Sequence, residues 1–335
     1  MATLPLLPES QPRLIGIARL ASEGESLRQG HKVEYFTLPA RSLLNRCVSK
    51  RQMPFTWTIN PYRGCEFACK YCYARYTHEF MEMRDGVDFE RKIYVKQHAA
   101  DLLRQELRQV KAGEEIAIGT ATDPYQPAEK RFEVTRAILE EFARHQGYEI
   151  GIVTKSNLVV RDTDLLLEIS RHNRLFVNIT ITTLDVDLAR ILEPRAPRPY
   201  LRLDAMRQLV QSGVAAGVIC APVIPEITDK PKDLEALVKA VGEAGGKYIF
   251  ANSLFLKPCS AAIFLPFLEQ KFPQLAAGFR KRYETRAFLN TAYKKRLSQL
   301  MSRLREKYGI HNEYDRYSRR THPVAHGDPE QMKLF

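Results

Sequence analysis

The sequence predicts an α/β fold, a partial (β/α)6 TIM-type barrel with an N-terminal arm and a basic helical extension at its C-terminal end. Two observations predict this fold: short apolar segments recur along the chain, and segments with helical spacing lie between them. Strict alternation implies parallel strands joined by right-handed crossovers, and six such units curl toward an incomplete barrel. The predicted strands lie within residues 56–62, 114–122, 148–155, 174–182, 213–224 and 247–255.

The predicted helices lie between these strands, and several are followed by a glycine, which is favoured just after the end of a helix. In a barrel of this kind the residues that carry the chemistry lie at the C-terminal ends of the strands. Functional side chains are therefore expected directly after each predicted strand. The predicted helices cover residues 98–110, 134–147, 162–172, 199–213 and 232–246.

The pattern divides the chain into four parts. Residues 1–54 are predicted to form an arm or irregular layer, because no strand or helix period persists there, and residues 55–258 form the barrel. Residues 259–310 form a helical extension, and residues 311–335 are polar and aperiodic, as in a flexible tail. The extension includes one amphipathic helix from Ala287 to Glu306. Its apolar stripe is Leu289, Tyr293, Leu297, Leu300 and Leu304.

Composition indicates a folded protein, with 335 residues, 44% hydrophobic and 27% charged residues, and a formal net charge of +12. No apolar run approaches the ~20 residues needed to span a bilayer, and the N-terminal segment lacks a signal for secretion. We expect a cytoplasmic protein without membrane association. Six cysteines are too few for a disulfide scaffold, and three of them lie within eight residues, which indicates metal chemistry.

Cys65, Cys69 and Cys72 have the spacing C-x-x-x-C-x-x-C in a turn-rich segment directly after the first predicted strand. Three thiolates on one short loop suit three irons of a [4Fe–4S] cluster and leave the fourth iron open for a chelating ligand. A structural zinc ion is an alternative, but it requires a fourth ligand, such as Cys47 or His78. Three core cysteines without a metal are a further alternative, although core cysteines usually scatter along a chain.

The cysteine spacing, its position and the strand–helix alternation resemble the radical S-adenosylmethionine (SAM) superfamily over residues 55–255. The resemblance implies that the three cysteines hold a [4Fe–4S] cluster whose open iron binds SAM. It also implies that electron transfer cleaves SAM to methionine and a 5′-deoxyadenosyl radical, which abstracts a hydrogen atom from the substrate. A reductant such as flavodoxin or ferredoxin is then an expected partner.

Within this superfamily the chain resembles the spore photoproduct lyase group of DNA repair enzymes, in a branch with the motif NPYRGCxxxCxxCY at residues 60–73. The resemblance implies that Tyr71 and Tyr73 relay a radical beside the cluster, and aromatic packing is the alternative. The lyase cysteine that donates a hydrogen to the product radical has no counterpart in residues 119–124. Cys220 and Cys259 can replace it only if the fold brings one of them to the same cavity.

Polar residues follow the second and third predicted strands, where the resemblance implies contacts with SAM. Thr120, Thr122 and Asp123 follow the second strand and are candidates to hold the methionine amino group. A proline-fixed turn in which Asp123 caps the next helix is the alternative. Thr154 and Lys155 end the third strand, where Lys155 resembles the lysine that binds the SAM carboxylate. A solvated lysine at a strand end is the alternative.

Further candidates follow later strands or the cysteine loop. Thr180 and Thr182 end the fourth strand, where hydroxyls meet ribose or carboxylate groups, although both could instead point outward. Arg195 lies on a proline-flanked loop, where it either binds an anionic substrate or forms a surface salt bridge. His78 and Glu79 follow the cysteine loop, where they orient the substrate or cap the next element.

The C-terminal region is strongly basic. Between Arg280 and Arg320 there are 13 Lys or Arg residues against 4 Asp or Glu residues, with tyrosines interleaved. This pattern predicts a surface that binds the phosphates of DNA or another nucleic acid, and a solvated helix face is the alternative. The last residues, Gln331 to Phe335, resemble the Q-x-x-L-F peptide that docks on the bacterial DNA sliding clamp. A terminal Leu-Phe pair that packs on the parent fold is the alternative.

We therefore expect a lyase-like radical SAM enzyme that acts on DNA or a nucleic-acid lesion. One alternative is a radical SAM enzyme that acts on RNA, a peptide or a small molecule. The other is a DNA-associated iron–sulfur protein without turnover.

Overall fold

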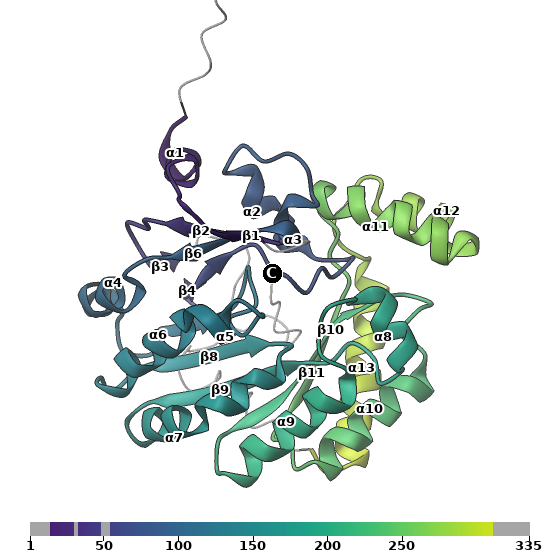
Figure 1. Ribbon diagram of the computed structural model, residues 1–335. Coiled ribbons are helices and arrows are strands. Elements are labelled where there is room, and N and C mark those ends of the chain that lie inside the picture. The colour runs from purple at the N-terminus through teal and green to yellow at the C-terminus, as the bar shows by residue number, and fades with distance from the viewer. Residues whose placement is uncertain (1–13, 30–32, 48–53, 311–335) are drawn as a thin grey trace, which may run out of the picture.

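The structure is a computed structural model, and it describes residues 14–29, 33–47 and 54–310. Its main element is a seven-stranded sheet with the strand order β11-β10-β9-β8-β7-β4-β3 (Figure 1). Neighbouring strands are parallel from β4 to β11, and β3 pairs antiparallel with β4 at one edge. The strands are β3 (Leu44–Arg46), β4 (Trp57–Ile59), β7 (Glu115–Ile118), β8 (Glu149–Thr154), β9 (Arg174–Thr180), β10 (Ala216–Val223) and β11 (Ile249–Ser253).

The six parallel strands lie within the six segments that the sequence predicts as strands, and they follow one another in chain order across the sheet. The α/β fold class with a partial barrel is therefore confirmed. In the described part of the chain, no helix has the length and apolar character needed to cross a membrane.

Helices connect the parallel strands and cover the outside of the barrel (Figure 1). The five predicted helices are all present, and most end a few residues earlier than the apolar pattern suggests. Helix α9, for example, ends before Gly213, whose φ of +98° lies in the left-handed region that favours glycine. These helices are α4 (Ala99–Glu106), α6 (Val134–Ala143), α7 (Thr163–His172), α9 (Pro199–Gln211) and α10 (Pro231–Glu243).

Shorter helices lie in the loops that follow the strands. They are η1 (Tyr73–Arg75), α2 (Tyr76–Glu79), α3 (Asp88–Arg91), η2 (Leu107–Gln109), α5 (Glu129–Phe132), η3 (Asn157–Asp162) and α8 (Val186–Leu192).

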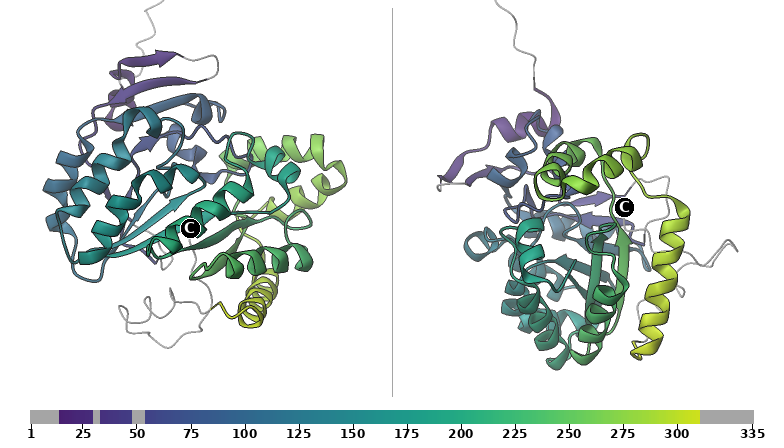
Figure 2. Two further views of the ribbon diagram at one scale, coloured as in Figure 1. Left: turned by 60° about the horizontal axis from the view of Figure 1, so that its bottom comes forward. Right: turned by 90° about the vertical axis from the view of Figure 1, so that its right-hand side faces the viewer.

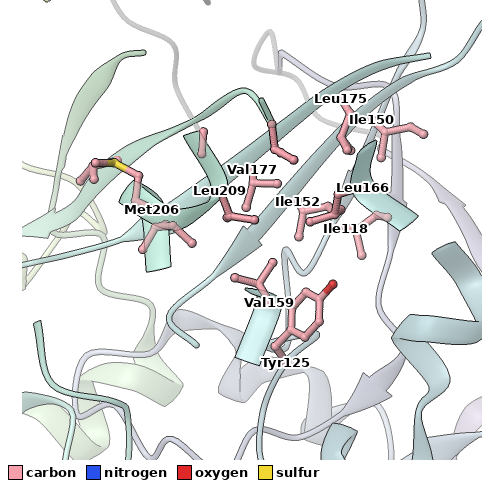
Figure 3. Close-up of a cluster of buried hydrophobic side chains, with 14 of the residues drawn as sticks. Ile118, Tyr125, Ile150, Ile152, Val159, Leu166, Leu175, Val177, Met206 and Leu209 are labelled. Carbon is pink, nitrogen blue, oxygen red and sulfur yellow. The ribbon is translucent and has the colours of Figure 1, made fainter. Parts of the chain in front are cut away.

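The core fills the space between the strands and the covering helices. Figure 3 shows Ile118, Ile150, Ile152 and Val177 of neighbouring strands beside side chains of the surrounding helices. Ile118, Ile152 and Val177 are fully buried. Burial stabilises this layer by roughly 25 cal/mol per Å² of apolar surface. The helix side chains in this cluster include Leu166, Met206 and Leu209.

The N-terminal region differs from the predicted arm or irregular layer. It contains α1 (Gly16–Ser22), β1 (Ser26–Gln29), β2 (Glu34–Leu38) and the edge strand β3. A second sheet, ordered β1-β2-β6-β5, joins this region to β5 (Tyr62–Arg63) and β6 (Lys92–Lys96). Strand β2 pairs in parallel with β6, far away along the chain, so the local sequence pattern gives no sign of this partner.

Three helices follow β11: α11 (Pro258–Lys271), α12 (Pro273–Tyr283) and α13 (Thr291–Lys307). Helix α13 starts four residues later than predicted, because the Asn290 side chain caps it by accepting a hydrogen bond from the Tyr293 N–H at 2.9 Å. Its buried stripe of Leu297, Met301 and Leu304 packs against β11 and α10, and Figure 2 shows α13 along the outside of the barrel.

The predicted tail, residues 311–335, lies outside the described residues. Residues 1–13, at the start of the predicted arm, also lie outside them. The proposed clamp peptide from Gln331 to Phe335 is part of that tail. The division of the chain into four parts therefore stays a prediction.

Candidate active site

The loop with the three cysteines leaves β5 through Gly64, whose φ is +85°. A Cβ atom at this position would lie 2.7 Å from the carbonyl oxygen of Lys92 and 2.9 Å from that of Phe89, so only glycine fits. The N–H of Cys65 donates to the Phe89 carbonyl at 2.9 Å. This close approach ties the start of the cysteine loop to the segment before β6.

The buried Arg75 side chain holds the rest of the cysteine loop in place. It is only 2% exposed, and it donates to the carbonyl oxygen of Cys69 at 3.0 Å and to the carboxylate of Glu90 at 2.7 Å. It also donates to the carbonyl of Gly86. A planar guanidinium with several donors suits this role, because it bridges the loop and the following turn at once.

The three thiols line one cavity at the C-terminal ends of the parallel strands. Its empty volume is about 1030 Å³, with the open solvent at its mouth included. Six of the seven strand-end residues predicted to contact SAM line the same cavity, and Thr182 is the exception. The six are Thr120, Thr122, Asp123, Thr154, Lys155 and Thr180.

The thiols suit a soft metal centre. Burial raises the pKa of Cys65, Cys69 and Cys72, that of Cys69 to about 12, so all three are neutral without a metal. A bound metal deprotonates coordinating thiols, and thiolate ligands favour iron–sulfur clusters and zinc. This donor set therefore fits a [4Fe–4S] cluster. Among the described residues, no three Cys, His, Asp or Glu side chains are grouped as a site for a single metal ion.

Tyr71 and Tyr73 lie on either side of Cys72, and both line the cavity. The Tyr71 hydroxyl donates to the carboxylate of Glu193, and the Tyr73 hydroxyl donates to the carbonyl oxygen of Thr120. Burial raises the pKa of both phenols well above the usual value. Both phenols therefore keep their protons, which suits a radical relay as well as a packing role. The radical relay stays a prediction.

Asp123 connects two strand ends. Its carboxylate accepts hydrogen bonds from the Thr154 hydroxyl and the Lys155 N–H, both at 2.7 Å, and from the Tyr125 N–H at 2.9 Å. These contacts fix the loop after β7 against the end of β8. They agree with the turn-capping role weighed in the sequence, while the residue still lines the cavity.

Lys155 projects over the ring of Tyr71, with its ammonium nitrogen 5.8 Å from the ring centre. Burial lowers its pKa, but the negative charges of the Glu193 carboxylate and of Cys69 as a thiolate outweigh burial and leave the pKa raised. Its ammonium therefore stays charged beside the thiols. This is the charge that a carboxylate ligand in the cavity requires.

Glu193 and Arg202 form a buried ion pair that sequence analysis missed. Their charged groups lie 2.5 Å apart, and each residue is only 1% exposed. Glu193 also accepts hydrogen bonds from Tyr71 and, at 3.2 Å, from the Thr182 hydroxyl. Thr182 therefore lies behind the cavity wall and supports Glu193 there. The sequence singles out Arg195 in the Glu-Pro-Arg segment, but Glu193, two residues earlier, is the one that contacts Tyr71 of the cavity wall.

A second missed network ties the cysteine loop to the segment after β7. The Gln126 side chain donates to the Gly64 carbonyl at 3.1 Å and accepts from the Glu66 N–H at 3.0 Å. The Glu66 carboxylate in turn accepts from the Ala128 N–H at 2.7 Å and from the Tyr35 hydroxyl at 2.9 Å. Polar residues at these positions carry no periodic signal, so only the fold brings them together.

Several candidates lie away from the thiol cavity. His78 is fully buried against the rings of Phe89 and Tyr94, and burial lowers its pKa to about 4. Arg195 is exposed, and its guanidinium donates to the Glu90 carbonyl at 3.3 Å. Neither residue lines the cavity, so neither is placed to bind a ligand there.

The remaining cysteines are also outside this cavity. The Cys220 thiol points to the carbonyl oxygen of Thr182 at 3.9 Å, and the Cys259 thiol points to that of Tyr73 at the same distance. Neither lines the cavity wall, so the fold does not bring them to the position of a hydrogen donor there. Cys47 lines a second, adjoining cavity.

A thiol-lined cavity at the C-terminal ends of parallel barrel strands defines an α/β-barrel enzyme with a soft-metal cofactor. The chain belongs to the radical SAM superfamily, whose family model matches residues 59–240. Members of this superfamily use a [4Fe–4S] cluster and SAM, and these are the cofactors of this radical SAM enzyme. Radical SAM enzymes need a reductant.

Other proteins share the sequence or the fold of this chain. The chain is 32% identical over 279 residues to an uncharacterized protein of Mycobacterium tuberculosis, covering 83% of this chain and 82% of that protein. It is 29% identical over 251 residues to an uncharacterized protein of Methanocaldococcus jannaschii, covering 75% and 86% of the two chains. The structure of spore photoproduct lyase complexed with dinucleoside spore photoproduct has the same fold, with a TM-score of 0.62, 17% identity, and coverage of 82% and 79%.

Proposed function

We propose that this radical SAM enzyme acts on DNA or a nucleic-acid lesion in the cytoplasm. The observation that carries the proposal is the exposed basic face of α13, which begins beside the barrel cavity. The fold shared with spore photoproduct lyase is consistent with a nucleic-acid substrate.

In this proposal Cys65, Cys69 and Cys72 hold the [4Fe–4S] cluster. When bound, the cluster supplies the electron that cleaves SAM to methionine and a 5′-deoxyadenosyl radical. The Lys155 ammonium binds the SAM carboxylate, since it is the charged group beside the thiols. The hydroxyls of Thr120 and Thr180 supply hydrogen bonds in the same cavity, while the Thr154 hydroxyl donates to Asp123 and holds that carboxylate in position.

The basic face lies opposite the buried stripe of α13. Within α13 itself, from Thr291 to Lys307, there are six Lys or Arg residues and one Glu residue. Lys295, Arg296 and Arg303 are exposed along α13. Just before the helix, the ring of Phe288 stacks 4.2 Å from that of Phe255, which lines the cavity. A duplex or strand held on this face would therefore extend to the cavity mouth.

DNA binding should weaken strongly with salt, because each neutralised phosphate releases counterions. We expect the double variant Lys295→Glu/Arg303→Glu to flatten the log–log salt slope by about 2 units, at roughly 0.9 per phosphate contact. The measurement is fluorescence anisotropy of labelled duplex DNA across a salt series. The matched control is Arg108→Glu/Lys111→Glu, near α4 on the opposite side of the barrel (Figure 1). Equal slopes for both double variants would contradict a binding role for this face.

The enzyme should not reverse the thymine spore photoproduct catalytically. Residues 119–123 line the cavity without a cysteine, and hydroxyl or methyl hydrogens are held too strongly to replace a thiol hydrogen. The measurement is product formation per enzyme from the dinucleoside lesion, with SAM and reductant under anaerobic conditions. Repeated turnover would contradict this prediction, and Cys47→Ala, Cys220→Ala and Cys259→Ala would then identify the cysteine responsible.

Transfer of deuterium from labelled substrate into 5′-deoxyadenosine tests the proposed function. We expect transfer from ultraviolet-irradiated DNA with the reconstituted, reduced enzyme. Transfer only from RNA, a peptide or a small molecule would overturn the DNA assignment, and absence of SAM cleavage would favour an iron–sulfur protein without turnover. Flavodoxin or ferredoxin as the reductant and the sliding clamp as a partner of Gln331–Phe335 stay predictions.

A further inference from the structure

A second cavity adjoins the thiol cavity. Tyr73, Thr120, Ala121 and Phe255 line both cavities and form the wall between them. The other lining residues come from β3 to β6 and the segments beside them, from α2 and its end, and from the segment after β11. The cavity therefore lies where the first and last strands of the partial barrel leave its side open.

The charged side chains that line this cavity within the described residues are all basic. Arg46, Arg63, Lys96 and Lys257 line it, and none of the described residues in its lining is Asp or Glu. Lys257 holds its ammonium 3.7 Å from the ring centre of Tyr76. The Arg63 guanidinium donates to the Thr77 carbonyl at 3.3 Å, and its buried Nε has no hydrogen-bond partner in the described structure. These cations would attract an anionic ligand.

Lys96 is the clearest indication of a ligand. Its side chain lies on β6 and is only 7% exposed, and no hydrogen bond or ion pair within the described residues involves its ammonium. Burial and the charge of Arg63 lower its pKa to about 7, although Glu106 partly opposes them. A buried ammonium without a partner is costly, and an anion bound in the cavity would remove that cost.

Aromatic rings complete the wall. The rings of Tyr73 and Tyr76 stack with centres 6.4 Å apart, and Phe80 meets Tyr76 edge-on at 5.7 Å. Phe80 is 58% exposed, so its ring is accessible at the edge of this cavity. Stacked aromatic rings beside cations are typical of sites that bind nucleobases and phosphates together.

We propose that this second cavity binds a nucleotide unit of the substrate, with Lys96 and Arg63 at its phosphate and the Tyr73–Tyr76–Phe80 rings against its base. The inference rests on the proposed action on nucleic acid and identifies residues that hold a nucleotide unit of the substrate next to the thiol cavity. It places that nucleotide beside Tyr73, on the other side of the wall from the thiols.

Binding of a single-stranded thymidine trinucleotide to the anaerobic, reconstituted enzyme tests the proposal by calorimetry. Three further probes separate its parts: the same trinucleotide with neutral methylphosphonate linkages, an abasic trinucleotide, and inorganic phosphate. We expect the native trinucleotide to bind at least about tenfold more tightly than each of them, since each lacks the charge or the base. Equal binding of the neutral probe, or of the abasic probe, would overturn the assignment to a nucleotide.

Lys96→Met should weaken trinucleotide binding about tenfold or more and remove the preference over the neutral probe, whereas Lys96→Arg should keep both. The thermal midpoint of Lys96→Met should not fall below that of the wild type, because this substitution removes an unpaired buried charge. The matched control is Lys92→Met on the same strand, where Lys92 pairs with Asp88 at 3.2 Å outside the cavity. Equal affinity of Lys96→Met and the wild type would overturn the proposal.

The basic face of α13 is tested separately. Lys295→Glu/Arg303→Glu should weaken binding of long duplex DNA and keep trinucleotide affinity, because the trinucleotide occupies only the cavity. If duplex DNA still binds α13 while Lys96→Met has no effect, this inference fails and the proposed function stands. If the wild type binds neither duplex nor trinucleotide, both fail.

Discussion

Alanine at Cys65, Cys69 or Cys72 should each abolish SAM cleavage, the largest effect we expect from any single substitution. The wild-type enzyme, prepared anaerobically, should be brown, hold about four irons per chain and produce 5′-deoxyadenosine on reduction with SAM. Each variant loses one of three thiols that line the same cavity, and no other described cysteine lines it to take its place. Iron content, visible absorption and 5′-deoxyadenosine formation measure the loss.

Cys259→Ala is the matched control, because Cys259 lies outside the thiol cavity with its thiol directed to the Tyr73 carbonyl. It should keep the iron, the colour and SAM cleavage. Cys47→Ala separates the cluster from the zinc alternative, since a zinc site needs a fourth ligand. Stoichiometric zinc without iron in anaerobic, reduced wild-type protein, lost in Cys47→Ala, would contradict the cluster assignment.

The barrel could be predicted from sequence because its strands are buried on both faces. Segments such as the one around Ile150 and Ile152 are continuous apolar runs, and the turns and helices between them carry their own signals. The second sheet could not be predicted. Residues 34–38 of β2 pair with residues 92–96 of β6, and such distant pairing leaves no local period. The start of α13 was predicted too early, because the Asn290 side chain caps the helix at that point.

The residues of the candidate site likewise fall into those that the sequence pattern reveals and those that it does not. The three cysteines were visible because ligands on one loop must be close in sequence, and the strand-end position of Lys155 follows from the barrel rule. Glu193, Arg202 and Gln126 were not visible, because their partners lie on other elements. Arg202 even occupies a predicted amphipathic helix, where an arginine normally indicates the solvent face.

These hidden residues connect the cysteine loop to the barrel. Glu193 lies directly after α8, accepts the Tyr71 hydroxyl and pairs with Arg202 of α9. The Arg202 guanidinium also donates to the carbonyl oxygens of Pro197 at 2.7 Å and Thr180 at 3.1 Å. Thr180 lines the cavity, so one buried arginine fixes both the end of β9 and the carboxylate that holds Tyr71. The geometry of the site therefore depends on this pair.

Breaking the pair should be strongly destabilising. Glu193→Gln leaves the Arg202 guanidinium buried without a counter-charge, and Arg202→Met leaves the Glu193 carboxylate with Lys155 as its remaining cation. We expect each variant to lose about 3–5 kcal/mol of unfolding free energy, the usual cost of removing one partner of a buried ion pair. Urea unfolding of the full-length protein, followed by circular dichroism, measures this loss.

The matched control lies on the same helix. Arg207 pairs with Asp204 at 3.0 Å, but both side chains are more than 40% exposed. Arg207→Met should therefore cost at most about 1 kcal/mol, because solvent screens an exposed pair. The double variant Glu193→Gln/Arg202→Met should lose less stability than the sum of the single variants, since the second substitution removes the charge that the first left unpaired. Additive losses, or equal losses for Arg202→Met and Arg207→Met, would show that the two charges are not coupled and that the Tyr71 and Thr182 hydroxyls hold Glu193 in place.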